Sequence, residues 1–122
     1  MKKGKILVLG ASPREERYSH KALKLLLEMG YEAVPVHPKA EAILGQRCHA
    51  DPESVPGPVD TITLYVGAEH STAMMEGLLA AEPRRIIFNP GTENAALEAA
   101  AREKGIETVQ GCTLVMLRTN QF

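Results

Sequence analysis

The sequence of 122 residues has only two cysteines, two phenylalanines, three tyrosines and no tryptophan. A chain of this length can build one hydrophobic core without disulfides, so two cysteines favour a reducing compartment. No apolar run approaches the roughly 20 residues of a membrane-spanning helix. Behind the basic residues 1–3, the apolar run 6–9 is also too short for a signal-peptide core. We therefore expect a soluble, cytoplasmic protein of one domain that binds no membrane.

The chain also lacks an excess of charge of either sign. Its 14 Lys and Arg residues balance 15 Asp and Glu residues, which gives a formal net charge of −1. A dedicated nucleic-acid-binding domain normally carries a strongly basic face, so we expect no nucleic-acid partner. Cys48 and His49 are adjacent, but the cysteines and histidines show no metal-binding spacing, and we expect no metal.

Short runs of strand-forming residues alternate with amphipathic segments along the chain. The first run, Lys5–Leu9, is almost continuously apolar, which is typical of a central strand buried on both faces. Pro35 in the second run indicates an edge strand or a strand end. The predicted strands are Lys5–Leu9, Glu32–Val36, 61–66 and Arg85–Phe88, with 107–109 and 113–117 together forming the last.

Apolar residues spaced three and four apart predict three helices between these strands. The first follows Ser19 as N-cap and ends at Gly30, the second begins near Glu69, and the third ends at Lys104-Gly105. Residues 41–44 suggest one further helical turn, and 46–58 read as a loop. Alternating strands and helices imply right-handed crossovers. The expected fold is α/β: a Rossmann-like, three-layer α/β/α domain with a five-stranded, mostly parallel sheet.

The loop after the first predicted strand has the composition of an anion site. In such sheets ligands bind at the carboxyl ends of the strands. Here the chain reads Gly10-Ala11-Ser12-Pro13-Arg14 and enters a helix at Tyr18-Ser19, where backbone amides, the helix dipole and Arg14 or Arg17 favour phosphate. The alternative is a tight turn followed by an N-cap. A single glycine in a long loop is not the dinucleotide-binding fingerprint.

The loop after the second predicted strand separates nucleotide classes more sharply. A nicotinamide-dinucleotide enzyme normally places Asp or Glu there to hold the ribose hydroxyls. This chain has Val36-His37-Pro38-Lys39, with no acid before Glu41. The segment suits a phosphorylated ribose or a pyrophosphate, unless Pro38 only ends the strand and Lys39 only faces solvent. The loop Asn89-Pro90-Gly91 either admits a ligand at Gly91 or is a plain turn with Thr92 capping the next helix.

Taken together, these loops closely resemble the small stand-alone CoA-binding proteins, which are related to the CoA-binding domain of the succinyl-CoA synthetase alpha subunit. The likeness covers nearly the whole chain and is strongest in the first 45 residues. Before the third predicted strand, Pro58-Val59-Asp60 also fits. The segments that carry it most strongly are Gly10-Ala11-Ser12-Pro13, Tyr18-Ser19, 30–39 and Ile43-Leu44-Gly45.

The resemblance implies a Rossmann-like domain that binds coenzyme A across the strand ends. It places the phosphates at Gly10, Ala11, Ser12 and Pro13 and at the helix start Tyr18-Ser19. It places Val36, His37, Pro38 and Lys39 beside the adenosine and its phosphates, Leu64, Tyr65 and Val66 beside the adenine or pantetheine, and Asn89, Pro90 and Gly91 beside the pantetheine arm.

Two places depart from the pattern of the family. Many members have a Gln-x-Gly type of sequence where this chain has Asn89-Pro90-Gly91, and an arginine is often expected near Tyr65-Val66-Gly67. The second synthetase domain, which carries the phosphorylated histidine, has no counterpart here. The resemblance therefore implies no ligase activity.

Two reactive side chains lie near the expected ligand site. His70, beside Glu69, is either a general base or a surface residue in the first turn of a helix, and no partnered nucleophile is evident. Cys112, within the last predicted strand, is either a small core residue or a thiol that forms a mixed disulfide with CoA.

From the sequence we expect a non-catalytic protein that binds CoA or an acyl-CoA. One alternative is a small NAD(P)-linked or other nucleotide-dependent enzyme, which the absent fingerprint and the absent acid disfavour. Another is a regulatory module that senses CoA and passes the signal to a protein partner. The sequence does not identify such a partner.

Overall fold

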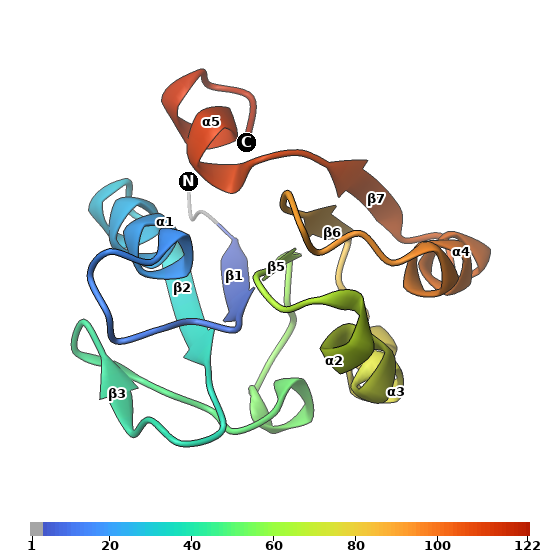
Figure 1. Ribbon diagram of the computed structural model, residues 1–122, viewed down its shortest axis with the longest axis horizontal. Helices are drawn as coiled ribbons and strands as arrows, with labels where there is room; N and C mark the ends of the chain where they lie inside the picture. Colours follow the sequence, from blue (N-terminus) through green and yellow to red (C-terminus); the bar gives the residue numbers. More distant parts are fainter. Residues whose placement is uncertain (1–3) are drawn as a thin grey trace.

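A sheet of five parallel strands forms the centre of the protein in the computed structural model, which describes residues 4–122 (Figure 1). The basic residues 1–3, which entered the signal-peptide argument, lie outside the described residues. The spatial order of the strands is β2-β1-β5-β6-β7, and each neighbouring pair is parallel. This confirms the expected Rossmann-like α/β fold. The strands are β1 (Lys5–Leu9), β2 (Glu32–Val36), β5 (Thr61–Leu64), β6 (Arg85–Phe88) and β7 (Glu107–Gln110).

The strand order reverses between β1 and β5. From β1 the chain first adds β2 on one side, then crosses to β5 on the other side and continues outward to β7. Ligands of open parallel sheets bind at such a reversal, outside the carboxyl ends of the strands. The loops that follow β1 and β5 therefore flank the expected binding position. Pro35 lies in the edge strand β2, as its presence in the sequence predicts.

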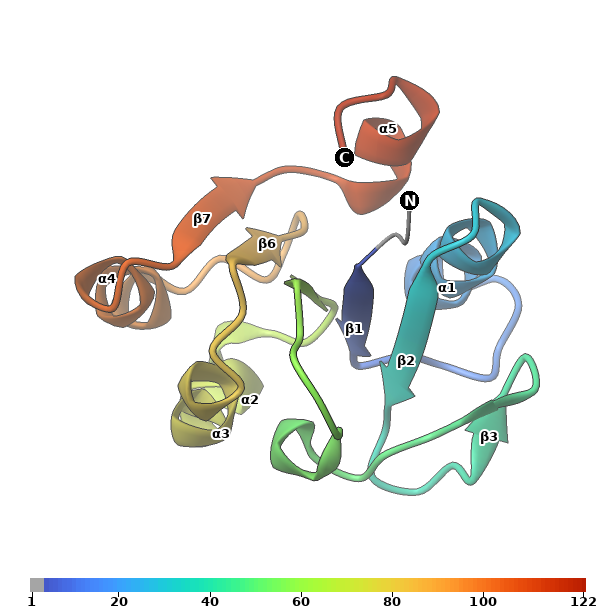
Figure 2. The same ribbon diagram turned by 180° about the vertical axis from the view of Figure 1, so that it is seen from behind.

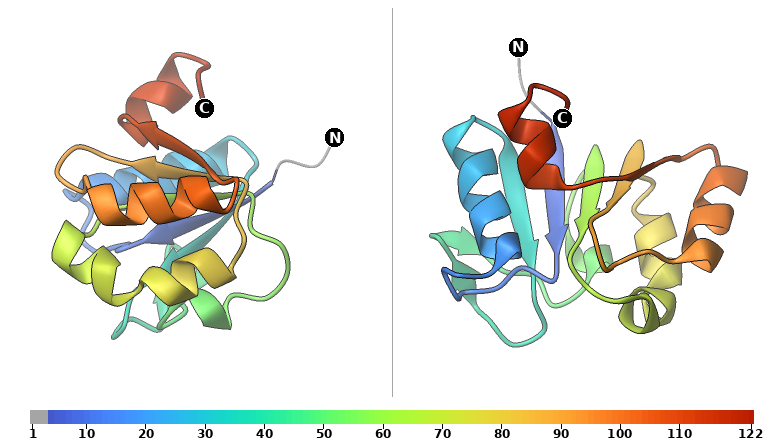
Figure 3. Two further views of the ribbon diagram at one scale, coloured as in Figure 1. Left: turned by 90° about the vertical axis from the view of Figure 1, so that its right-hand side faces the viewer. Right: turned by 45° about the horizontal axis from the view of Figure 1, so that its top comes forward.

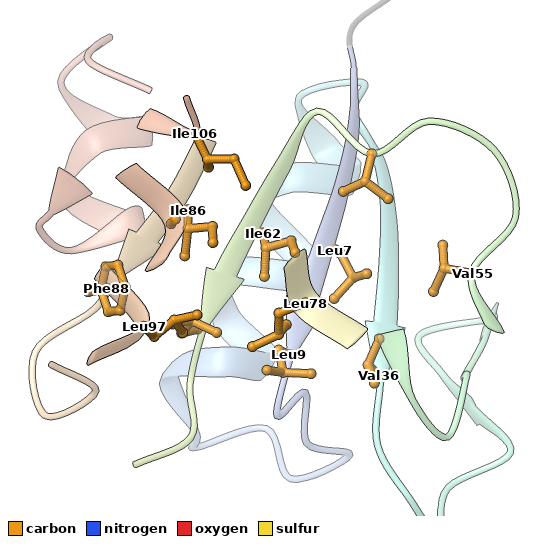
Figure 4. Close-up of a cluster of buried hydrophobic side chains, with 13 residues drawn as sticks. Leu7, Leu9, Val36, Val55, Ile62, Leu78, Ile86, Phe88, Leu97 and Ile106 are labelled. Atoms are coloured by element: carbon orange, nitrogen blue, oxygen red, sulfur yellow. The ribbon is translucent and has the colours of Figure 1, made fainter. Parts of the chain in front are cut away.

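Helices cover both faces of this sheet (Figure 3). On one face, Leu7 and Leu9 of β1 pack in a cluster with Leu78 and Leu97 (Figure 4). This face is covered by α2 (Ala68–Ala73), α3 (Met75–Ala80) and α4 (Ala95–Glu103). On the other face, the alternate β1 residues Ile6 and Val8 join a second cluster. That face is covered by α1 (Tyr18–Glu28) and α5 (Thr113–Arg118), which contribute Leu23, Leu26 and Leu117.

The ends of α1 show one confirmed and one wrong prediction. Gly30 has φ of 88° and its N–H bonds the carbonyl of Leu27, while the Tyr31 N–H bonds Leu26. These two bonds form the left-handed C-terminal motif that favours glycine. At the other end, Arg17 and not Ser19 is the N-cap residue, and Ser19 is buried in the first turn.

Residues 113–117 form a helix and not part of the last strand. Leu114 and Leu117 are three residues apart, and both are buried on the side of α5 that faces the protein. The Thr113 N–H that begins this helix donates to the Asn89 side chain at 2.8 Å. The segment is short and contains the β-branched residues Thr113 and Val115, so its local preference is for a strand. The hydrogen bond to Asn89 favours the helix instead.

The predicted helical turn at 41–44 is a β-hairpin, which lies beyond β2 (Figure 2). Its strands are β3 (Ala42–Ile43) and β4 (Gln46–Arg47), and β4 and the 3₁₀ turn η1 (Pro52–Ser54) occupy part of the predicted loop 46–58. Leu44 and Gly45 both have positive φ, 52° and 76°, as a two-residue hairpin turn requires. The predicted second helix is also divided at Met74, into α2 and α3.

Candidate functional site

Gly10 places the loop after β1 between the ends of β2 and β5. Its N–H donates to the carbonyl of Val36 at 3.1 Å, and its φ is 88°. A Cβ atom at this position would lie 2.8 Å from Cγ1 of Val66 and 3.0 Å from the carbonyl oxygen of Tyr65. Both the backbone conformation and this close approach favour glycine. The loop thus begins at the reversal of strand order.

Internal hydrogen bonds fix the rest of this loop. The Ser12 hydroxyl accepts from the Arg14 N–H at 3.1 Å, and the Arg17 N–H donates to the Arg14 carbonyl at 3.1 Å. The Ser12 carbonyl lies 2.9 Å from Nδ1 of His20, a buried residue of α1. The loop is therefore attached to the helix that it enters.

The first turn of α1 is open to an anion. Within residues 4–122, no side chain caps its first amides, and the turn contains no acidic residue. Arg14 and Arg17 are exposed beside it, and Arg14 contacts Glu16 at 3.3 Å. Uncapped amides and the positive end of an eleven-residue helix favour a phosphate or carboxylate at this position.

His37 presents a hydrogen-bond donor to the same region. Its Nδ1 accepts from the backbone N–H groups of Lys39 at 3.0 Å and Ala40 at 3.1 Å. Nδ1 is therefore the acceptor nitrogen and Nε2 carries the ring proton. The backbone N–H of His37 bonds the carbonyl of His49 at 2.9 Å, which continues the pairing along β2. These bonds hold the ring at the end of the edge strand.

Two adjoining hollows occupy the carboxyl ends of the strands. We name the first the loop chamber, of about 440 Å³, and the second the helix chamber, of about 390 Å³. They share Tyr18 and Tyr65, so they adjoin, and we call the two together the groove. The loop chamber is otherwise lined by Gly10, Ala11, Ser12, Arg14, Arg17, Ser19 and His37, and the helix chamber by Asn89, Pro90, Cys112, Leu114, Val115 and Arg118.

Asn89 builds the floor of the helix chamber. Its amide nitrogen donates to the Thr63 hydroxyl at 2.7 Å and to the Leu64 carbonyl at 2.8 Å. Its amide oxygen accepts from the Thr113 N–H at 2.8 Å, and the Thr63 and Thr113 hydroxyls are 2.7 Å apart. All three side chains are buried. This network attaches the start of α5 to the ends of β5 and β6.

Tyr65 lies at the junction of the two chambers. Its hydroxyl oxygen is buried and has no hydrogen-bond partner of normal geometry within residues 4–122. Burial raises the pKa of Tyr65 to about 12, and the neighbouring Thr113 and Thr63 hydroxyls act in the opposite direction. The phenol therefore keeps its proton at neutral pH.

The structure brings ten of the predicted site residues to the groove and leaves seven outside its lining. The ten are Gly10, Ala11, Ser12, Arg14, Tyr18, Ser19, His37, Tyr65, Asn89 and Pro90. The side chains of Val36 and Leu64 belong to the hydrophobic core. The other five outside the lining are Pro13, Pro38, Lys39, Val66 and Gly91. The alternative cap Thr92 is also not used, because Asn94 caps α4.

Three lining residues were not predicted: Leu114, Val115 and Arg118. All belong to α5. The spacing of three between Leu114 and Leu117 was the signal in the sequence that could have indicated this helix. Cys112, predicted inside a strand, is instead the N-cap residue of α5, half-buried and lining the helix chamber. His70 is exposed on α2 and lines neither chamber.

Outside this groove the described residues offer few other features of a binding site. A further hollow, of about 610 Å³, lies at the ends of α3 and α4 and is lined by Glu76, Glu82, Lys104 and apolar residues. Across residues 4–122 no group of three His, Cys, Asp or Glu side chains is arranged to hold a metal. None of the helices in that range is long and apolar enough to cross a membrane.

The fold and the groove define a Rossmann-like domain with a hollow at its strand-order reversal. The sequence profile of the CoA binding domain family matches residues 4–118, and the chain belongs to this family. The prediction made from the loop residues is thereby confirmed at the level of the family.

Known proteins similar to this chain share the fold over most of its length. The solved structure of an uncharacterized protein is 41% identical, covers 100% of both chains and superposes with a TM-score of 0.92. The Uncharacterized protein YneT of Bacillus subtilis is 28% identical over 83% of this chain and 75% of its own. A dinucleotide-forming acetyl-coenzyme A synthetase of Ca. Korarchaeum cryptofilum, at 22% identity and a TM-score of 0.74, shows the same fold in 25% of its length and 88% of this chain.

Proposed function

We propose that this protein binds coenzyme A or an acyl-CoA in the groove formed by the loop chamber and the helix chamber, without catalysing a reaction. Membership of the CoA binding domain family supports the ligand. The proposed position of the ligand is supported by one observation: two adjoining chambers of different character lie at the strand-order reversal. One is rich in donors and cations, and the other is mostly apolar.

The donor set of the loop chamber fits the phosphates of CoA. Arg14, Arg17 and the Nε2–H of His37 supply donors to its lining, and the open first turn of α1 supplies backbone amides. No Asp or Glu lines either chamber within the described residues. An anion in this chamber therefore meets donors without a facing carboxylate.

The helix chamber fits the pantetheine arm. Pro90, Leu114 and Val115 supply apolar wall, and the half-buried Cys112 lies in the same chamber. Pantetheine is a mostly apolar chain with two amides, which needs apolar contact and few polar partners. The ligand would cross from one chamber to the other beside Tyr18 and Tyr65. Tyr18, whose side chain is 69% exposed, gains apolar contact when the groove is filled.

The same groove disfavours an NAD-linked enzyme. Such enzymes use a carboxylate at the end of the second strand to hold the ribose diol. In this position the chamber has His37, and the nearest acid in sequence, Glu41, does not line it. The proposed absence of catalysis is supported by the place of His70, which lies outside both chambers.

Calorimetric titration tests the ligand directly. The purified protein is titrated with CoA, with acetyl-CoA, and with NAD⁺ and NADP⁺ as matched nucleotide controls. We expect micromolar binding of CoA and no heat from the dinucleotides. Dinucleotide binding without CoA binding would favour the oxidoreductase alternative. Incubation with acetyl-CoA and a thiol reagent then tests catalysis, and we expect no release of free CoA above the rate without protein.

A further inference from the structure

The following inference rests on the proposed function and concerns Arg118, a charged residue of the helix chamber. Arg118, the last residue of α5, is the one charged residue that lines this chamber among residues 4–122. Its side chain is exposed and forms no salt bridge within that range, whereas Arg14, Arg84 and Arg102 each contact a carboxylate. Among the described residues, the chamber thus offers a guanidinium that no carboxylate pairs.

Arg118 and the other cationic side chains of the groove line different chambers, and this arrangement indicates which kind of ligand matches the groove. Arg14 and Arg17 line the loop chamber, Arg118 lines the helix chamber, and the two chambers share Tyr18 and Tyr65. The helix chamber also has apolar lining from Pro90, Leu114 and Val115. A ligand that matches both chambers has anionic groups in the loop chamber, and an apolar segment with a second anionic group in the helix chamber.

From this arrangement we propose that the protein prefers acyl-CoA thioesters whose acyl group ends in a carboxylate, and that Arg118 binds this carboxylate. The planar guanidinium presents paired N–H donors that match the two oxygens of a carboxylate. Among the described residues, no Asp or Glu lines the helix chamber beside Arg118. Arg118 is therefore a specificity-determining residue for the acyl group.

A pair of thioesters of equal chain length isolates this contribution. Succinyl-CoA and butanoyl-CoA each carry a four-carbon acyl group, and only the first ends in a carboxylate. We expect the wild-type protein to bind succinyl-CoA about three- to fivefold more tightly, which is the size of a part-exposed ion pair. The preference should shrink as the ionic strength is raised.

Variants of Arg118 assign the preference to that side chain. In Arg118→Gln the ratio of the two dissociation constants should fall to near one, and in Arg118→Lys a part of it should remain. Arg102→Gln is the matched control, because Arg102 is also exposed on a helix but lies outside both chambers. Far-ultraviolet circular dichroism shows that each variant is folded.

The outcomes separate this inference from the proposed function. If CoA and butanoyl-CoA bind but succinyl-CoA binds no more tightly than butanoyl-CoA, the inference is wrong and the proposal of CoA binding stands. If Arg118→Gln weakens unacylated CoA as much as succinyl-CoA, Arg118 contacts the nucleotide and the inference is again wrong. If no CoA species binds, the proposed function fails first.

Discussion

The amide oxygen of Asn89 accepts a hydrogen bond from the backbone N–H of Thr113 at 2.8 Å, so a residue at the end of β6 determines where α5 begins. The other side of the same amide bonds Thr63 and Leu64. Asn89 therefore connects the central sheet to the helix that carries Cys112, Leu114, Val115 and Arg118. This relationship forms the helix chamber.

Replacing Asn89 should affect both stability and binding. Asn89→Ala removes three buried hydrogen bonds and leaves the Thr113 N–H without a partner, which should lower the free energy of unfolding by about 2–4 kcal/mol. Asn94→Ala is a matched control, because the buried Asn94 amide also makes several hydrogen bonds, three through its nitrogen and one through the oxygen that caps α4, and it lines neither chamber. Urea denaturation should show a loss in both variants, and calorimetry should show weaker CoA binding in Asn89→Ala alone. Equal affinity in the two variants would contradict the assigned role of α5.

Gly10→Ala should destabilise the fold and weaken CoA binding. The new Cβ would meet Val66 and the Tyr65 carbonyl, and the residue would have to keep a φ of 88°. We expect a loss of about 2 kcal/mol or more in the free energy of unfolding. Gly67→Ala serves as the control, because no atom lies within 4 Å of its added Cβ and its φ is −68°. A Gly10→Ala protein as stable as Gly67→Ala would show that the close approach at Gly10 is not tight.

Tyr65→Phe should leave the protein as stable as the wild type or slightly more stable. Within residues 4–122 the buried hydroxyl has no hydrogen-bond partner of normal geometry, although the Thr113 and Thr63 hydroxyls are near it, so its removal deletes a poorly compensated polar group. Because the folded pKa of Tyr65 is about 12, the unfolded chain loses this proton first, and wild-type stability falls as the pH rises from about 10 toward 12. Chemical denaturation at pH 8 and pH 11 should show a smaller fall in Tyr65→Phe. A large loss of stability at pH 8 would mean that the hydroxyl is bonded.

Asp60 should make the fold sensitive to acid. The Arg84 side chain donates to the Asp60 carboxylate at 3.0 Å and 3.3 Å, and this holds the pKa of Asp60 below its usual value. A lowered carboxyl pKa contributes stability above the unfolded pKa near 4, and the contribution is lost as the pH falls through the folded value. Asp60→Asn should cost about 1 kcal/mol or less at pH 7, because the pair is partly exposed, and the difference from wild type should vanish below about pH 3. A difference that persists at pH 2.5 would assign the effect to packing instead.

The sequence predicted the sheet well because its central strands β1, β5 and β6 are buried, and burial leaves a local signal in the residues of each. The apolar run of β1 and the proline of β2 identified a central and an edge strand. The start of the site was predictable for the same reason, since Gly10 and the helix that follows it are adjacent in sequence. The resemblance of these segments to a known family then supplied the ligand class.

Local signals indicated the second half of the groove only weakly, through the spacing of Leu114 and Leu117. The start of the helix at 113–118 is also held by a long-range contact, because Asn89, 24 residues before Thr113, bonds the first amide of that segment. Arg118 and Val115 reach the groove as residues of this helix. The composition of the loop after β2 indicated that Lys39 contacts phosphate. In the structure the Lys39 N–H donates to Nδ1 of His37, and the lysine lies outside both chambers.

Arg17 and Lys39 allow a direct comparison of two positions for the bound CoA: the one proposed from the groove, and the one beside Lys39 that the resemblance implies. Both side chains are exposed cations, but only Arg17 lines the loop chamber. Arg17→Ala should weaken CoA binding by about three- to tenfold, the size of one charge-assisted contact to phosphate, with little change in Tm. Lys39→Ala should weaken it less, and mainly at low ionic strength, because a cation outside the chamber acts on the ligand only through screened attraction. Titrations of both variants at two salt concentrations measure this difference. A stronger effect of Lys39→Ala at high salt would place the adenosine end of the ligand beside the loop after β2, outside the groove described above.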